Sequence, residues 1–69
     1  MPEAKALAQK SKELRREMHE SQIEFAYHCG ISTETLSLIE REHADPRLST
    51  VQKIAAYTNM TVSELLEVK

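Results

Sequence analysis

Apolar side chains recur at intervals of three and four residues along most of the chain, a spacing typical of amphipathic helices rather than strands. Five stretches carry this pattern, and they predict helices at about residues 3–18, 22–29, 33–41, 48–58 and 62–67. Between the third and fourth stretches, the segment Arg41-Glu42-His43-Ala44-Asp45-Pro46 lacks the periodicity. The residue before a proline is pushed out of the helical region, so this segment is expected to be a connector.

Polar residues mark the ends of these helices. Ser21 and Glu24 fit a capping box, in which each side chain accepts a hydrogen bond from a free backbone N–H of the first turn. Thr61 and Glu64 repeat the same spacing before the last helix. Ser32 is the expected cap of the third helix.

Glycine and asparagine mark two of the other helix ends. Gly30 is the only glycine in the chain, and it is expected to end the second helix in the left-handed conformation. Asn59 is expected to end the fourth helix in the same way.

The composition changes this picture little. With 69 residues, 41% hydrophobic and 29% charged, the chain is expected to form a single all-α domain over residues 1–69. Its longest apolar run is too short to span a membrane, and its one cysteine, Cys29, cannot form an internal disulfide. We therefore expect a soluble protein of the reducing cytoplasm, with no membrane association.

Catalytic and metal-binding patterns are not found. The three histidines, His19, His28 and His43, fall on different elements, and no nucleophile or carboxylate pair recurs beside them. A single cysteine with scattered histidines also lacks the spacing of a zinc site. We expect no enzyme activity, no metal and no cofactor.

The order of elements is the more specific signal. A capping box, a short helix, a glycine, an apolar residue, a capping serine and a second short helix form the pattern of a helix-turn-helix, whose second helix can enter the major groove of DNA. The sequence also resembles the lambda-repressor-like (Xre-type) domains, from residue 7 to residue 66. The resemblance rests on the segments LRREM (14–18), SQIEFA (21–26), CGIS (29–32), TLSLIERE (35–42), DPRLSTVQKIA (45–55) and MTVSELL (60–66).

This resemblance implies a compact five-helix DNA-binding domain in which helices two and three form the helix-turn-helix. It implies base contacts by Thr33, Glu34 and Leu38, and DNA backbone contacts by Gln22, Ser32, Ser37, Arg41 and Arg47. It also implies that Gln22 braces a side chain of the third helix, and that Arg15 pairs internally with Glu40.

Physical reasoning supports the internal pair independently. Glu40 shares the inward face of its helix with Leu36 and Ile39, and a buried carboxylate without a partner would be costly. Truncating one member of a buried pair typically costs roughly 3–5 kcal/mol. The alternative for Arg15 is a solvent-facing charge on the first helix.

The predicted recognition surface is chemically sparse. Thr33 can offer a methyl and a hydroxyl, Glu34 can accept from a cytosine amino group, and Leu38 can only make apolar contacts. Residues 21–47 hold two basic and five acidic side chains, a net charge of −3, and many family members have glycine where this chain has Glu42. Such charges repel phosphates, so we expect weak binding by a monomer. Steep dependence on salt is expected only if the following side chains converge on the DNA side: Lys10, Arg16, Arg41, Arg47 and Lys53.

Two classes of function remain open at this stage. The first is a sequence-specific transcriptional regulator of double-stranded DNA, expected to be a repressor that binds a palindromic operator as a homodimer. The second is a protein-interaction module on the same scaffold, because Ile23, Tyr27 and Leu38 are apolar where the family is often polar. Four side chains near the C-terminus are candidates for self-association: Tyr57, Val62, Leu66 and Val68.

Overall fold

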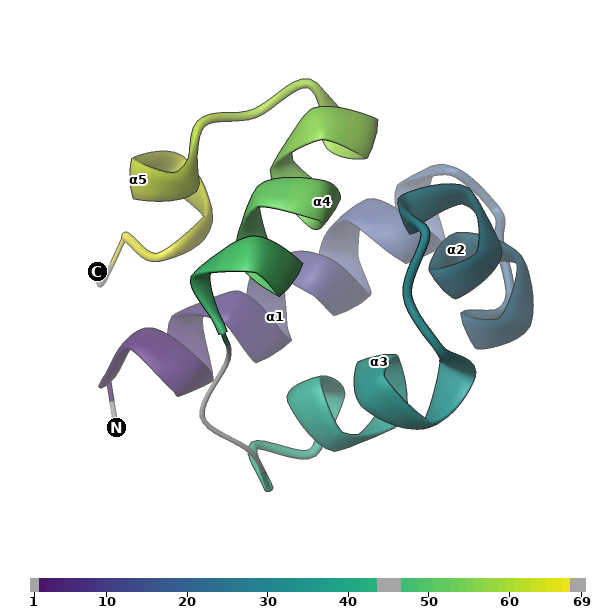
Figure 1. Ribbon diagram of the computed structural model, residues 1–69, viewed down its shortest axis with the longest axis horizontal. Helices are drawn as coiled ribbons and strands as arrows, with labels where there is room; N and C mark the ends of the chain where they lie inside the picture. Colours follow the sequence, from purple (N-terminus) through teal and green to yellow (C-terminus); the bar gives the residue numbers. More distant parts are fainter. Residues whose placement is uncertain (1, 44–46, 68–69) are drawn as a thin grey trace.

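Five helices make up most of the protein (Figure 1), whose computed structural model describes residues 2–43 and 47–67. The helices are α1 (Pro2–Glu17), α2 (Gln22–Cys29), α3 (Thr33–Glu40), α4 (Leu48–Thr58) and α5 (Val62–Leu65). α1 contacts α3 and α5, α2 contacts α3 and α4, and α4 also contacts α5. The predicted all-α fold of five helices, with a short turn joining α2 to α3, is confirmed.

Some helix ends differ slightly from the ranges expected from the sequence. The bounds of α2 and α4 coincide with residues 22–29 and 48–58, whereas α1, α3 and α5 end one or two residues earlier than expected. At the ends of α3 and α5, the N–H groups of Arg41 and Leu66 still bond to carbonyls of the last turn. Their backbone has already left the helical region, with φ and ψ of −95° and 1° at Arg41 and −98° and 4° at Leu66.

One apolar core joins all five helices. Its largest fully buried apolar side chains are Leu7 of α1, Phe25 of α2, Leu36 of α3, Val51 and Ile54 of α4, and Leu65 of α5. Burying a side chain of this size contributes about 1.5–3 kcal/mol. The position of α3 is therefore set by a core to which every helix contributes. None of the helices in the described ranges is both long and apolar enough to cross a membrane.

The predicted caps are present. The Ser21 hydroxyl accepts from the Glu24 N–H at 3.1 Å, and the Ser21 N–H donates to the Glu24 carboxylate at 2.9 Å. Thr61 and Glu64 make the same two bonds at the start of α5. Gly30 and Asn59 end α2 and α4 in the left-handed conformation, with φ of 79° and 57°.

Two further helix ends use the left-handed conformation without glycine or asparagine. His19 follows α1 with φ of 57°, and Glu42 follows α3 with φ of 60°. After α3, the Glu42 N–H bonds to the Ile39 carbonyl and the His43 N–H to the Leu38 carbonyl, which is a Schellman motif. A residue with a Cβ is disfavoured in this conformation, so glycine would suit position 42 better than glutamate does.

Candidate nucleic-acid interface

The residues of α3 divide into an outer and an inner face. Thr33 and Glu34, at the first two positions of the helix, are exposed, while Ser37 and Leu38 are half-buried. Leu36, Ile39 and Glu40 are buried, as the periodicity predicted. The structure therefore leaves two of the three predicted base-contact residues free on the outer face, and it leaves Leu38 with only part of its side chain accessible.

A local hydrogen-bond pair fixes the start of this helix. The Ser32 hydroxyl accepts from the Thr35 N–H at 3.0 Å and donates to the Thr35 hydroxyl at 2.6 Å. The turn that carries Thr33 and Glu34 is therefore fixed by two bonds of Ser32, one to the backbone and one to the side chain of Thr35. Ser32 is itself exposed, and its hydroxyl oxygen can still accept a further bond.

The inner face of α3 is anchored by Glu40, whose side chain is only 3% exposed. Arg15 of α1 donates to both carboxylate oxygens, from Nε at 3.0 Å and from Nη2 at 3.0 Å. Gln22 of α2 donates to the same carboxylate from Nε2 at 2.9 Å. Bidentate bonds from arginine to a carboxylate are among the strongest in proteins, so this network ties α3 to both α1 and α2.

Three further predicted backbone-contact residues also lie at helix ends. Gln22 lies at the first position of α2, where the second amide hydrogen of Nε2 stays available beside the bond to Glu40. Arg41 is exposed at the end of α3, and its Nε lies 3.4 Å from the Ser37 carbonyl. Arg47 is exposed at the start of α4 and makes no side-chain capping bond there. Residues 44–46, which connect α3 to Arg47, lie outside the described residues.

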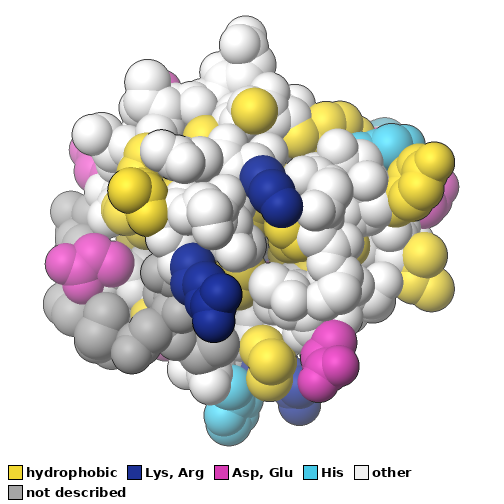
Figure 2. All heavy atoms as spheres, in the orientation of Figure 1, with side chains coloured by type: hydrophobic (Ala, Val, Ile, Leu, Met, Phe, Trp, Pro, Cys, Tyr) yellow, Lys and Arg dark blue, Asp and Glu magenta, His cyan; other side chains and the backbone are white. Residues whose placement is uncertain are grey.

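Basic side chains occupy part of the surrounding surface. With α4 in front, basic side chains lie near the centre of the visible face and also at its lower edge, and acidic side chains lie toward its rim (Figure 2). Lys53 of α4 reaches the turn between α2 and α3, with Nζ 3.5 Å from the Gly30 carbonyl. Lys10 instead lies 3.8 Å from Glu13 on its own helix. Of the five basic residues considered from the sequence, Lys53 is thus placed beside the helix-turn-helix and Lys10 is paired elsewhere.

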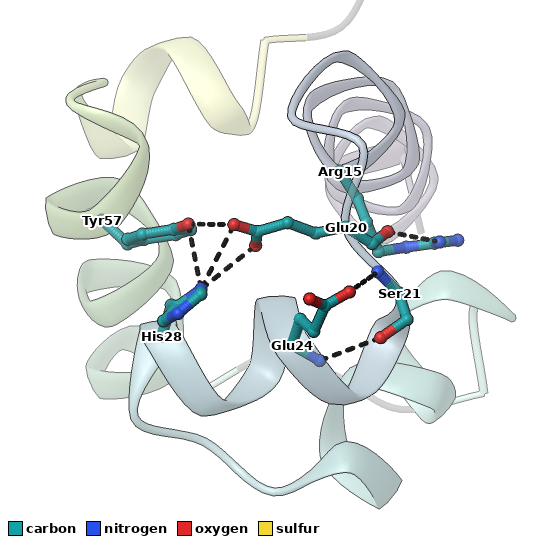
Figure 3. Close-up of polar contacts among 6 residues, drawn as sticks. All are labelled: Arg15, Glu20, Ser21, Glu24, His28 and Tyr57. Carbon is teal, nitrogen blue, oxygen red and sulfur yellow. Dashed lines mark hydrogen bonds and ion pairs between the residues drawn. The ribbon is translucent and has the colours of Figure 1, made fainter.

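A second polar cluster joins the connection after α1 to α2 and α4 (Figure 3). The Tyr57 hydroxyl donates to the Glu20 carboxylate at 2.6 Å, and His28 Nδ1 lies 3.1 Å from the same hydroxyl and 3.2 Å from the carboxylate. The hydrogen bond to Glu20 raises the pKa of Tyr57 to about 12. This cluster could not be found by sequence reasoning, because His28 and Tyr57 lie 8 and 37 residues from Glu20 and come together only in the folded chain.

The remaining polar chemistry of α2 is structural. Hydrogen bonds from the backbone and side chain of Ser21 lower the pKa of Glu24, which keeps the capping carboxylate ionised. Burial raises the pKa of the Cys29 thiol to about 11, which makes it a poor nucleophile at neutral pH. Over residues 2–43 and 47–67, no three His, Cys, Asp or Glu side chains are grouped so that they could hold a metal ion.

Three of the C-terminal apolar residues considered for self-association also pack against the core. Tyr57, Val62 and Leu66 are partly buried and lie against the core cluster. Tyr57 also packs edge-on against Phe25, with ring centroids 5.6 Å apart. Val68, the fourth member of that set, lies outside the described residues.

Comparisons with known proteins agree with this architecture. The model of the family described as "Helix-turn-helix" matches residues 12–65. Antitoxin HigA1 from two Mycobacterium tuberculosis strains is 36% identical over 66 residues, covering 96% of this chain and 44% of the relative. The chain therefore spans less than half the length of the curated relatives it matches.

The solved structures include a similar fold. The crystal structure of a hypothetical transcription factor, NHTF, from Neisseria superposes with a TM-score of 0.87 at 29% identity, over 96% of this chain and 76% of that chain. The family match spans α2 to α5 and therefore includes the anchored helix-turn-helix described above. The chain belongs to the lambda-repressor-like helix-turn-helix family, whose domains bind DNA and are not enzymes.

Proposed function

We propose that this chain is a sequence-specific DNA-binding transcriptional regulator that inserts α3 into the major groove. The observation that carries the proposal is the division of α3 into an anchored inner face and an exposed outer face. Thr33 and Glu34 are exposed at its first turn, while Glu40 is held by Arg15 and Gln22. A rigidly mounted helix with free polar side chains at its N-terminal end is what base readout requires.

The proposed base contacts follow from side-chain chemistry. Thr33 contacts a thymine methyl or accepts and donates at a base edge, and Glu34 accepts from a cytosine amino group. Leu38 is half-buried, so it contributes a limited apolar contact. Because none of these three makes a bidentate bond to guanine or adenine, DNA shape supplies part of the specificity.

The proposed backbone contacts frame this surface. Gln22 and Ser32 lie at the starts of the two helices, and Ser37 lies half-buried on α3. Arg41 uses Nε on its own helix and keeps its terminal nitrogens for a phosphate. Arg47 is exposed at the N-cap position, immediately before α4. Such contacts set register and orientation rather than sequence preference.

The electrostatics favour binding as a pair of copies. The chain has a net charge of −2, and exposed Glu34 and Glu42 lie at the two ends of α3. Non-specific attraction of one copy to DNA is therefore weak. We infer that a homodimer on a palindromic operator supplies the affinity, with half-sites about 34 Å apart, and that repression follows where the operator overlaps a promoter.

A second candidate is a role that includes a protein partner. It is favoured by the likeness to a protein named as an antitoxin over 96% of this chain. In this case the domain would either bind both DNA and a partner protein, or keep the helix-turn-helix scaffold and bind the protein with little or no binding to DNA. The domain is cytoplasmic in either case.

Enrichment of random duplex DNA by the purified chain tests the proposal. The expected result is a recovered motif with two-fold symmetry, bound more weakly as salt rises. An unenriched pool, with no salt-sensitive binding by fluorescence anisotropy, would overturn the regulator and leave the protein-interaction module. A motif without symmetry would keep DNA binding and remove the palindromic operator.

A further inference from the structure

The outer face of α2 carries the most exposed large apolar side chains of the described residues. Tyr27 is 79% exposed and Ile23 is 68% exposed, and they lie one helical turn apart. Apolar, acidic and histidine side chains gather at the right-hand edge of Figure 2, beside the place of α2 in Figure 1. Leu48 on α4, at 62%, is the comparable exposed side chain on another helix.

Beside the apolar edge formed by Ile23 and Tyr27, α2 also carries a polar edge. Glu24 and His28 are both exposed and also lie one turn apart on α2. His28 Nδ1 contacts Glu20 and Tyr57, whereas Nε2 makes no hydrogen bond within the part of the chain that the structure describes. We call the surface formed by Ile23, Glu24, Tyr27 and His28 the α2 face.

The α2 face is complementary to itself. When two antiparallel helices are related by a two-fold axis, each edge of one helix meets the same edge of the other. An axis between residues 25 and 26 brings Ile23 next to Tyr27 of the copy along the apolar edge, and Glu24 next to His28 of the copy along the polar edge, with each pair offset by one residue, about 1.5 Å along the helix. The apolar edges then meet, and each carboxylate faces an imidazole rather than another carboxylate.

We propose that the α2 face binds the α2 face of a second copy of this chain, with the two α2 helices antiparallel about a two-fold axis. Side-chain chemistry favours this occupant, because a uniformly basic partner would match Glu24 but not His28. The other residues considered for self-association include Tyr57, Val62 and Leu66. These three side chains are partly buried against the core, so less of their apolar surface is left for a second copy.

The size of the face sets the strength of the contact. One face of an eight-residue helix is far smaller than the roughly 800 Å² that each partner buries in a stable interface. Association is therefore weak in solution, and it becomes effective when two copies are held side by side on one DNA molecule. This last step rests on the proposed function, whereas the contact itself does not.

Self-association without DNA tests the contact directly. Sedimentation velocity and amide NMR spectra over about 0.02–1 mM chain should show a weak dimer, with concentration-dependent shifts centred on residues 23–28. The I23S/Y27S variant should weaken dimerisation roughly tenfold or more, whereas L48S should not. Melting curves of both variants verify that they are folded.

Three outcomes would overturn the inference. They are a chain that stays monomeric throughout this range, shifts centred on α4 or α5 instead of α2, and an I23S/Y27S variant that dimerises like the wild type. A monomeric chain would leave the α2 face to a different protein. A monomeric chain that still enriches a DNA half-site would keep the proposed function and lose only this inference.

Disulfide cross-linking tests the direction of the helices. In a C29A background, a mixture of I23C and Y27C chains should cross-link faster than I23C chains alone, because position 23 faces position 27 of the copy. Faster linkage of I23C with itself would show a parallel or unrelated contact and would contradict the proposal.

Discussion

The two faces of α3 carry opposite kinds of polar chemistry. On the inner face, Glu40 is almost fully buried and accepts three hydrogen bonds, from Arg15 and Gln22. On the outer face, the Thr33 and Glu34 side chains are exposed and make no hydrogen bond within the described residues. The difference shows how a small domain can fix a helix from the inside and leave the outside free for a partner.

The largest expected effect comes from breaking the inner face. E40A should lower the free energy of unfolding by about 3–5 kcal/mol, because it leaves the guanidinium of the partly buried Arg15 side chain, 18% exposed, without its carboxylate. Urea denaturation measures this loss.

E34A on the outer face is the matched control, and it should change stability by no more than about 0.5 kcal/mol. Equal effects of E34A and E40A would show that the two faces do not differ in the way described.

Ser11 of α1 is a buried polar residue that, unlike Glu40, has no bonded partner within the described part of the chain. It lies one turn before Arg15 and is fully buried, but its hydroxyl has no hydrogen-bond partner among the described residues. S11A should therefore raise the free energy of unfolding by about 1 kcal/mol, since it removes an unsatisfied polar group and introduces a better helix former. A destabilised S11A in urea denaturation would mean that the hydroxyl is bonded after all.

Glu42 follows α3 in an unfavourable backbone conformation. Its left-handed backbone, with φ of 60°, is disfavoured for any residue with a Cβ. E42G should stabilise the domain by about 0.5–1 kcal/mol in thermal unfolding, because relief of this strain exceeds the added entropy of the unfolded chain. E42A keeps the Cβ while removing the charge, so a gain as large as that of E42G would assign the effect to electrostatics instead.

Much of the fold could be predicted because local chemistry encodes it. Ser21, Gly30 and Asn59 mark the ends of α2 and α4, and the bounds of those helices were predicted to the residue. The left-handed conformation of His19 and Glu42 was not predicted from the sequence, since a residue with a Cβ adopts it only rarely.

The candidate site divides in a similar way. Helical periodicity alone placed Glu40 on the buried face of α3 and Thr33 on the other. Periodicity could not show that Gln22 donates to Glu40, nor that Glu20, His28 and Tyr57 meet, because those contacts depend on how helices distant in sequence pack. The DNA contacts assigned to individual residues remain proposals.

The sequence preference of the T33A/E34A variant tests most directly whether the outer face of α3 reads DNA. Random-duplex enrichment should return a motif changed at the bases facing the first turn of α3, while stability stays within about 0.5 kcal/mol of the wild type. S63A/E67A, which removes a hydroxyl and a carboxylate from exposed positions 63 and 67, should return the wild-type motif. An unchanged motif for T33A/E34A would contradict the claim that the outer face of α3 reads DNA.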